Sequence, residues 1–421
     1  MSFFIKNVFY YIIFLQVYWL RKVECTDSEL DAKALKNLIE YLKIPTVHPN
    51  VNYEECVIFL KKQAQSLDLP IKVLELYPKN PIVIISWKGT EPEKPSILLN
   101  SHMDVVPVVS EKWKYPPFGA EMDEEGNIFA RGAQDTKSLA IQHLEAIRRL
   151  KLKGIRLKRT VHISMVPDEE TGGVFGMRSF VKTKEFTDLN IGFAVDEGSA
   201  NPSEKFYLYY GERTVLQIWV HCSGTTGHSS IFVPNTGAEK LRFIIDRFLD
   251  FREEEKIKYQ DPNQRDNVTS INLTMLKGGV QVNVVPDVLS AAFDIRVSPF
   301  INHTKFIETI DGWLKEAGDG VNYTVISKDS PTEITKLDSS NIYWLAFKKA
   351  CDENSVKLDT RILPGATDAR QLRALNIPAV AFSPMNNTIP RAHANNEYLN
   401  KRVFLRGINI MMKIVEAVAN A

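Results

Sequence analysis

The chain has 421 residues, a length at which two domains are expected because a single hydrophobic core stops growing well below this size. Hydrophobic residues make up 44% of it and charged residues 24%, as in an ordinary soluble globular protein. Since 52 Lys and Arg balance 51 Asp and Glu, nucleic acids and anionic membrane surfaces are poor candidates as partners. The four cysteines form no CxxC pair, which argues against a thiolate zinc site and a disulfide framework but allows one isolated disulfide.

Residues 1–25 form a distinct N-terminal segment. An apolar run of 13 residues, 8–20, lies between Lys6 and the pair Arg21-Lys22. Its length suits the core of a cleaved secretory signal peptide better than a transmembrane helix. The basic pair resists translocation, so an uncleaved signal anchor over residues 3–20 is the alternative, and it would be the chain's one membrane contact. Five Asn-X-Thr sequons favour a secreted glycoprotein over a cytoplasmic protein; they begin at Asn267, Asn272, Asn302, Asn322 and Asn386.

From residue 26 to about 207, strand and helix patterns alternate. Two helices are predicted within 26–70, and the elements that follow have the order of a layered α/β domain. The predicted strands are 71–76, 82–87, 97–99, 160–166 and 191–195, and the predicted helices are 137–150 and 174–182.

Between 208 and 327 the order becomes βαββαβ, which is the ferredoxin-like pattern. The predicted elements are strand 215–222, helix 238–258, strands 267–276 and 288–297, helix 306–317 and strand 322–327. The α/β pattern then resumes with helix 342–351, strand 377–382 and helix 403–419. We therefore expect a catalytic domain of residues 26–207 and 328–421, interrupted by an inserted domain of residues 208–327.

Five short segments that bear Asp, Glu or His lie at or near the ends of apolar runs. They are 96–104, 131–135, 166–170, 195–198 and 391–393. Buried carboxylates are costly unless they are paired or bind a metal. Each segment alone also fits an ordinary loop or the start of a helix. Together, the five mix His with carboxylates and predict that strand ends converge on a metal site.

The residue types suggest different tasks within such a site. His102 and Asp104 are two apart in an extended stretch, so their side chains share a face, where a carboxylate can orient a metal-binding imidazole. Asp135 directly precedes a predicted helix, and its two oxygens are able to bridge two metals.

Adjacent acids at a strand end suit metal-activated hydrolysis. The side chains of Glu169 and Glu170 diverge, so that one can bind a metal while the other accepts a proton from water. Glu197 has a similar place at a strand end, and His393 is available to complete the shell of a second metal.

The motifs around these residues resemble the M20 metallopeptidase family, and within it most closely the aminoacylase branch, which hydrolyses N-acyl-L-amino acids. The resemblance runs from about residue 27 to the C-terminus and rests on NSHMDVVP, ARGAQDTK, PDEETGG, AVDEGSANP, VNVVPDVLSAAFDIRVSP and FSPMNNTIPRAH. It implies a zinc-peptidase-like mixed-sheet catalytic domain and two Zn²⁺ ions per subunit. The implied metal ligands are His102 and Glu197 for one ion, Glu170 and His393 for the other, and Asp135 between them. The implied general base is Glu169, with Asp104 orienting His102.

The resemblance also implies a role for the inserted domain as a lid and dimerisation surface. His228 would reach the active site of a neighbouring subunit and stabilise the oxyanion, making the enzyme a homodimer. Asn283 and Arg296 match positions that bind the carbonyl and the free carboxylate of the substrate, and Thr367 and Asp368 match another segment of the site.

The chain departs from the family pattern at three places, which puts its substrate preference in doubt. Ala366 and Ala369 replace the usual Gly and Asn around Thr367-Asp368, and residues 394–396 lack the usual acids. The same ligands would also serve a dipeptidase or carboxypeptidase, which is the alternative activity. A catalytically silent binding protein is a further alternative, although no ligand is lost.

Overall fold

The computed structural model describes residues 26–421. The predicted signal peptide or anchor at 1–25 lies outside these residues. Within the described range, no helix is both long and apolar enough to cross a bilayer. Three of the four cysteines lie in this range, and Cys56, Cys222 and Cys351 are all free thiols.

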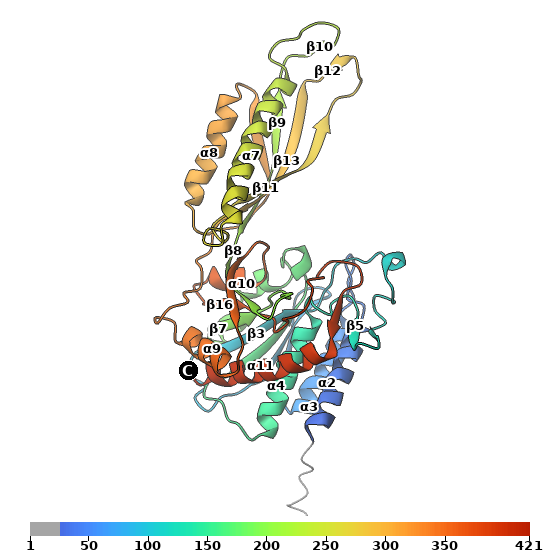
Figure 1. Cartoon of the computed structure of the whole chain (residues 1–421), viewed down its shortest axis with the longest axis vertical. Helices are drawn as coiled ribbons and strands as arrows, with labels where there is room; N and C mark the ends of the chain where they lie inside the picture. The colour runs from blue at the N-terminus through green and yellow to red at the C-terminus, as the bar shows by residue number, and fades with distance from the viewer. Residues whose placement is uncertain (1–25) are drawn as a thin grey trace, which may run out of the picture.

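A mixed eight-stranded sheet forms the larger body of the molecule (Figure 1). Its strand order is β1-β2-β6-β3-β7-β16-β8-β15. The strands are β1 (Ile71–Tyr77), β2 (Asn80–Trp87), β3 (Ser96–His102), β6 (Val161–Val166), β7 (Ile191–Asp196), β8 (Phe206–Glu212), β15 (Leu358–Leu363) and β16 (Ala379–Ala381). Because β6, β3 and β7 are parallel neighbours, their C-terminal ends meet at one edge of the sheet.

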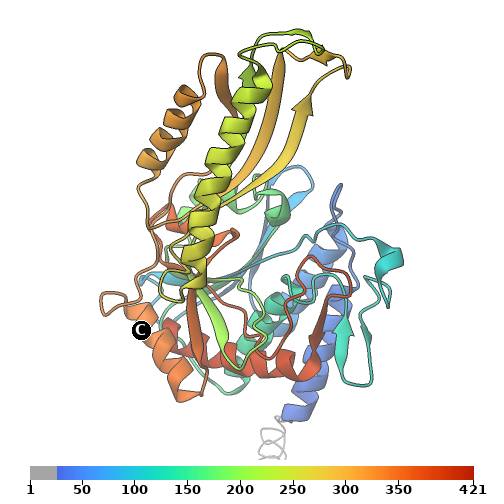
Figure 2. The same cartoon turned by 45° about the horizontal axis from the view of Figure 1, so that its top comes forward.

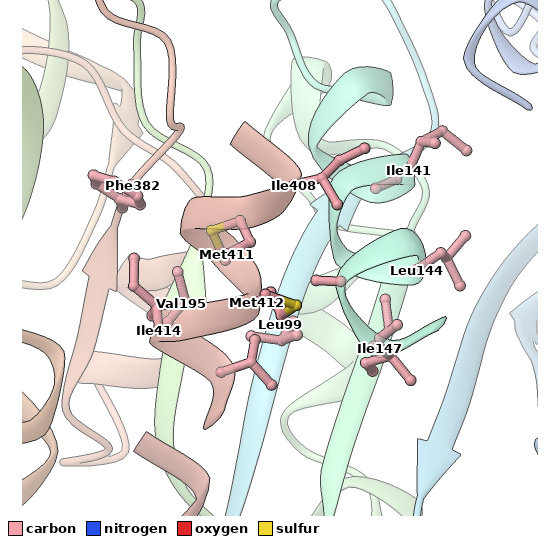
Figure 3. Packing of buried hydrophobic residues seen from close by; sticks show 14 of the residues in the cluster. Leu99, Ile141, Leu144, Ile147, Val195, Phe382, Ile408, Met411, Met412 and Ile414 are labelled. Atoms are coloured by element: carbon pink, nitrogen blue, oxygen red, sulfur yellow. The ribbon is translucent and has the colours of Figure 1, made fainter. Parts of the chain in front are cut away.

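Helices cover both faces of this sheet, as the two-residue alternation of its strands requires. Leu99 points to a core under α2 (Asp27–Leu42), α3 (Glu54–Leu67), α4 (Lys137–Leu152), α9 (Ile342–Glu353) and α11 (Lys401–Ala419). Leu98 points to the other core, under α5 (Met177–Phe180), α6 (Lys184–Thr187) and α10 (Ala369–Arg373). Figure 3 shows side chains of α4 and α11, among them Ile147 and Met412, gathered around Leu99. Burial of each such side chain contributes roughly 1.5–3 kcal/mol.

A four-stranded antiparallel sheet stands beyond the larger body, with α7 and α8 on one of its faces (Figure 2). The elements run β9 (Thr214–Ser223), α7 (Gly237–Gln260), β11 (Ser270–Gly278), β13 (Val288–Val297), α8 (His303–Glu316) and β14 (Val321–Lys328). The sheet order is β11-β13-β9-β14. Its core, which includes stacked rings of Phe248 and Phe293 with centroids 4.0 Å apart, is a separate cluster from the core of the larger body. The predicted βαββαβ order is therefore confirmed.

Short elements complete the described chain. The pair β10 (Gly227–His228) and β12 (Val284–Val285) lies at the far tip of the second sheet, while β4 (Glu121–Met122), β5 (Asn127–Phe129) and β17 (Tyr398–Asn400) form a small sheet. The 3-10 turns η1 (Ser110–Lys112) and η2 (Glu169–Thr171) lie in loops.

Two predicted elements and one predicted boundary differ from the structure. The helix expected at 174–182 is reduced to the four residues of α5, and the strand expected at 377–382 is reduced to the three of β16. Residues 206–212 form β8 and pair in the first sheet, so the second sheet begins at Thr214 rather than at 208.

Candidate metal centre

The ends of the three parallel strands carry the predicted site residues. His102 is the last residue of β3, Glu169 and Glu170 lie in η2 just after β6, and Glu197 directly follows β7. Asp135 comes from the turn that precedes α4. The topology thus brings together residues separated by up to 95 positions, because neighbouring parallel strands present the same end.

Asp135 lies between two groups of side chains. Its Oδ1 is 2.9 Å from Nε2 of His102, which is also 3.4 Å from Oε1 of Glu197. Its Oδ2 is 3.1 Å from Nε2 of His393, which is 3.0 Å from Oε2 of Glu170. One carboxylate therefore faces two His–Glu pairs, one through each oxygen. These five side chains are the ones that the resemblance to the M20 family implies as metal ligands.

Glu169 belongs to the first of these groups. Its carboxylate, Nε2 of His102 and the carboxylate of Glu197 offer ligand atoms that all lie within 4.8 Å of one another. Burial, and then the negative charge of Glu197, raises the pKa of Glu169 well above its ordinary value. Burial also raises the pKa of Glu197, although the nearby His102 opposes this shift.

The cluster has the composition of a site for cations. Four carboxylates, those of Asp135, Glu169, Glu170 and Glu197, surround a buried imidazole, that of His102, and a more exposed one, that of His393. Burial, followed by the negative charge of neighbouring carboxylates, raises the pKa values of three of these acids, Glu169, Glu170 and Glu197, whereas hydrogen bonds from His102 and His393 lower the pKa of Asp135. Imidazole and carboxylate ligands fit zinc, and the set would also accept other divalent transition metals.

Asp104 orients one ligand of the cluster and holds the loop that carries two others. His102 Nδ1 lies 2.9 Å from the main-chain oxygen of Asp104 and 3.6 Å from its carboxylate, which directs Nε2 towards Asp135. The same carboxylate accepts hydrogen bonds from the backbone N–H groups of Glu169, at 3.3 Å, and Glu170, at 3.1 Å. Asp104 thus links the ends of β3 and β6.

His48 is a supporting residue that the sequence did not reveal. Its Nε2 is 2.8 Å from Oδ2 of Asp104. This hydrogen bond raises the pKa of His48, although burial acts in the opposite direction. His48 reaches the site because Val47 forms an isolated bridge with Val105, and no local sequence pattern points to that pairing.

Glu397 is a second supporting residue, and its role was also not predicted. Its buried carboxylate accepts hydrogen bonds from the backbone N–H groups of Gly132 (3.2 Å), Gln134 (2.6 Å) and Asp135 (3.2 Å). It also pairs with Nη1 of Arg131 at 2.7 Å. These contacts attach the turn that carries Asp135 to the C-terminal loop that carries His393.

A cavity of about 800 Å³ opens onto the cluster. Arg296 of β13 and Thr367 line it together with the metal-site residues, so the second sheet contributes to its wall. Asp368 is buried and lies beneath the cavity, with Oδ2 3.4 Å from Nδ2 of Asn100.

Two of the predicted site residues, one catalytic and one substrate-binding, are elsewhere. His228, in β10, and Asn283, next to β12, lie at the exposed tip of the second sheet and do not line the cavity of their own subunit (Figure 1). The backbone oxygen of Asn283 accepts a hydrogen bond from Ser229, so the tip holds the two residues close together.

The fold and the cluster define a metal-dependent hydrolase with a mixed-sheet core. Residues 98–417 match the model of peptidase family M20/M25/M40, and the chain belongs to this family.

Similar proteins cover nearly the whole chain. Aminoacylase-1A of Rattus norvegicus is 47% identical over 90% of this chain and 94% of its own length. Aminoacylase-1 of Homo sapiens is 44% identical with the same coverage. Aminoacylase-1 of Dictyostelium discoideum is 42% identical over 90% of this chain and 96% of its own.

Solved structures share the fold at low sequence identity. An M20 metallo-carboxypeptidase from Sulfolobus solfataricus has a TM-score of 0.71 and 20% identity, covering 92% of this chain and 99% of its own. A tripeptidase from Staphylococcus aureus has a TM-score of 0.72 and 19% identity, covering 93% and 99%. These two support the fold alone.

Proposed function

We propose that the chain hydrolyses N-acyl-L-amino acids to a carboxylate and a free L-amino acid, using two zinc ions per subunit. The observation that carries the proposal is the position of Asp135 between two His–Glu pairs, with Glu169 beside them. The 42–47% identity to the aminoacylase-1 proteins supports the choice of substrate.

The residues divide into two ligand sets. His102 and Glu197 would hold one ion, Glu170 and His393 the other, and Asp135 would bind both. Ions in this position supply Lewis-acid polarisation of a carbonyl and lower the pKa of water. Asp104 and Glu397 keep the ligand-bearing loops in place through their backbone hydrogen bonds.

Glu169 is the proposed general base. In this proposal it is not one of the five ligands, and its buried carboxylate lies beside the first ligand set, within 4.8 Å of ligand atoms of His102 and Glu197, where it can reach a water held at that position. A raised pKa brings a carboxylate closer to the working pH, which favours accepting a proton from water and returning it to the leaving amine.

Substrate binding uses the second sheet. Arg296 donates to Asp294 through Nε and Nη2, which leaves the other N–H groups of its guanidinium free to bind the α-carboxylate of the substrate. His228 and Asn283 are too far along the second sheet to serve their own subunit. We infer that they enter the cavity of a partner subunit, as a lid and dimerisation surface, to bind the carbonyl and stabilise its oxyanion.

We also propose a secretory route, based on residues 1–25 and the sequons. Four of the sequon asparagines have exposed side chains, whereas Asn386 is buried and donates to the backbone oxygen of Glu204 at 2.9 Å. N-terminal sequencing of the mature protein, with a mobility shift after glycosidase treatment, distinguishes cleavage from anchoring. No shift at all would contradict the glycoprotein proposal.

The test of the enzyme compares Glu169→Gln with the unaltered protein. We expect two bound zinc ions in both, measured by metal analysis, and turnover of N-acetyl-methionine in the unaltered protein alone. Persisting turnover in the variant would reject Glu169 as the base. Zinc binding without turnover of acyl amino acids or dipeptides in either protein would favour a silent binding protein, and hydrolysis of dipeptides alone would favour a peptidase.

Subunit complementation tests the role of His228. Glu169→Gln has an intact His228, while His228→Ala has an intact metal cluster, so a mixed dimer contains one complete site. Mixing two inactive variants should therefore restore activity, up to about a quarter of the unaltered level for random pairing of equal amounts, since half of the dimers are mixed and each has one of two sites. Absence of recovery from demonstrably exchanging subunits would show that His228 does not act across a dimer.

A further inference from the structure

The cavity that opens onto the metal cluster contains three arginines from three different elements. Arg178 lies in α5, Arg296 in β13 and Arg370 in α10, and all three line the cavity of about 800 Å³. One substrate α-carboxylate needs only one guanidinium, so what else the cavity binds depends on whether each of the other arginines already has a carboxylate partner in the protein.

Two of the three arginines are paired with protein carboxylates. Nε and Nη2 of Arg296 lie 2.7 and 3.1 Å from the two oxygens of Asp294. Nη1 of Arg370 lies 3.3 Å from Oδ2 of Asp329. Their charges are compensated, although Arg296 keeps free donors.

Arg178 is different. Its side chain forms no hydrogen bond, ion pair or ring contact with any residue in 26–421, the range that the structure describes. The residue is half-buried and lines the cavity, and its guanidinium has no carboxylate partner there. An Arg in this state is a good receptor for a carboxylate, because two parallel charge-assisted hydrogen bonds match its planar fork.

Backbone hydrogen bonds hold Arg178 next to the loop that carries Glu169 and Glu170. Its N–H donates to the oxygen of Gly173 at 3.0 Å, and the N–H of Gly173 donates to the oxygen of Asp168 at 2.7 Å. The side chain of Asp168 accepts the N–H of Phe175 at 2.8 Å. These hydrogen bonds fold the loop between Glu169 and α5 into a compact turn, and they fix the position of the Arg178 backbone.

We propose that Arg178 determines specificity by binding a second carboxylate of the substrate, besides the α-carboxylate assigned to Arg296. This inference rests on the proposed function and narrows its substrate class to acyl amino acids that carry an additional acid. The additional acid belongs either to the side chain of the amino acid or to the far end of a dicarboxylic acyl group, and both present the same chemistry to the guanidinium.

The test uses two pairs of substrates that differ in one charge. N-acetylglutamate is compared with N-acetylglutamine, and N-succinyl-methionine with its terminal amide. For each pair, the ratio of kcat/KM values is measured in the unaltered protein, in Arg178→Met, and in Lys182→Met as a control that removes an exposed charge outside the cavity. Since each ratio is taken within one sample, it does not depend on the folded fraction.

We expect the unaltered protein and Lys182→Met to prefer the charged member of at least one pair by about 10–100-fold, the value of a charged hydrogen bond pair. Arg178→Met should reduce that ratio to near one, and the affected pair identifies the end of the substrate that Arg178 binds. Ratios near one in the unaltered protein, or ratios unchanged by Arg178→Met, overturn the inference.

Failure of the proposed function is recognised separately. If N-acetyl-methionine and both pairs are not hydrolysed, the enzyme assignment fails, and calorimetric affinities for the same pairs then decide the role of Arg178. Tighter binding of the charged members that Arg178→Met abolishes supports the inference, and equal binding of both members refutes it.

Discussion

Replacing Glu397 by Gln tests whether the C-terminal loop holds the turn that carries Asp135. The carboxylate of Glu397 is fully buried and accepts four hydrogen bonds, one of them from the buried Arg131. Gln has the same shape, but it keeps one acceptor oxygen and turns an NH₂ group towards the N–H groups that the other oxygen served. Arg131 would also lose its ionic partner.

The structure sets the expected size of the effect. Removal of one charge from a buried ion pair costs about 3–5 kcal/mol, because the other charge is left without compensation. At about 2 °C per kcal/mol for a unit of this size, the Tm should fall by about 6–10 °C. Because Asp135 loses the support of its backbone N–H, the affinity for zinc should also fall, by about 10–100-fold.

The assay compares Tm and zinc affinity in matched variants. Burial raises the pKa of Glu397 to about 7, so the measurements are made at pH 8, where its carboxylate is ionised. The control is Glu204→Gln, which breaks an exposed pair with Lys357 (2.9 Å) and should change the unfolding free energy by less than about 1 kcal/mol. Equal small effects of both substitutions, with unchanged zinc affinity, would refute the role given to Glu397.

Three further predictions concern the core, the support of Asp104 and the metal-free protein. Leu99→Ala should lower the free energy of unfolding, measured by urea denaturation, by about 3 kcal/mol, because the packed core under α4 and α11 cannot fill the space left by the side chain. A loss below about 1 kcal/mol would show that the core repacks around the substitution. His48→Ala should weaken zinc binding by about tenfold in chelator competition, and His48→Gln, which keeps a donor for Asp104, should recover most of it; equal losses would assign the effect to packing. Without zinc, hydrogen bonds that His393 donates to Asp135 and Glu170 raise its pKa from 6.5 to about 10, so this stabilisation is complete below pH 6.5 and disappears as the pH rises through 10. The Tm of chelator-treated protein should therefore fall over that interval more than the Tm of metal-free His393→Asn, and parallel curves would contradict this.

Two strands of the eight-stranded sheet were not predicted, β8 and β15. The apolar run of β8 directly precedes that of β9, and the two were not separated. Strand β15 lies at the edge of the eight-stranded sheet and is largely half-buried, so Leu358–Leu363 lacks the continuous apolar run of a central strand. The helix predicted at 174–182 is shortened because Asp168 holds residues 171–175 in a folded loop. The apolar residues in 174–182 indicate which side chains are buried, but they do not determine whether the backbone is helical.

Local sequence patterns placed several of the candidate site residues at strand ends. An acid or His after an apolar run marks such an end, and the structure places His102, Glu170 and Glu197 there. It could not find His48, which meets Asp104 across 56 residues through a loop contact, because such a contact depends on the path of the whole chain. The supporting role of Glu397 likewise required the backbone geometry of a turn more than 260 residues earlier.

The order of the two cores along the chain has a consequence for synthesis. The second core is continuous from β9 to β14, so it can fold as soon as that segment has left the ribosome. The larger core is incomplete until α11 has been synthesised. The metal cluster is incomplete until His393 and Glu397, which belong to the last part of the chain, have been synthesised. Newly made protein would thus pass through a stage with a finished second sheet and an exposed, incomplete acidic cluster. Premature termination near residue 390 should yield a chain that folds the second sheet yet binds no metal pair.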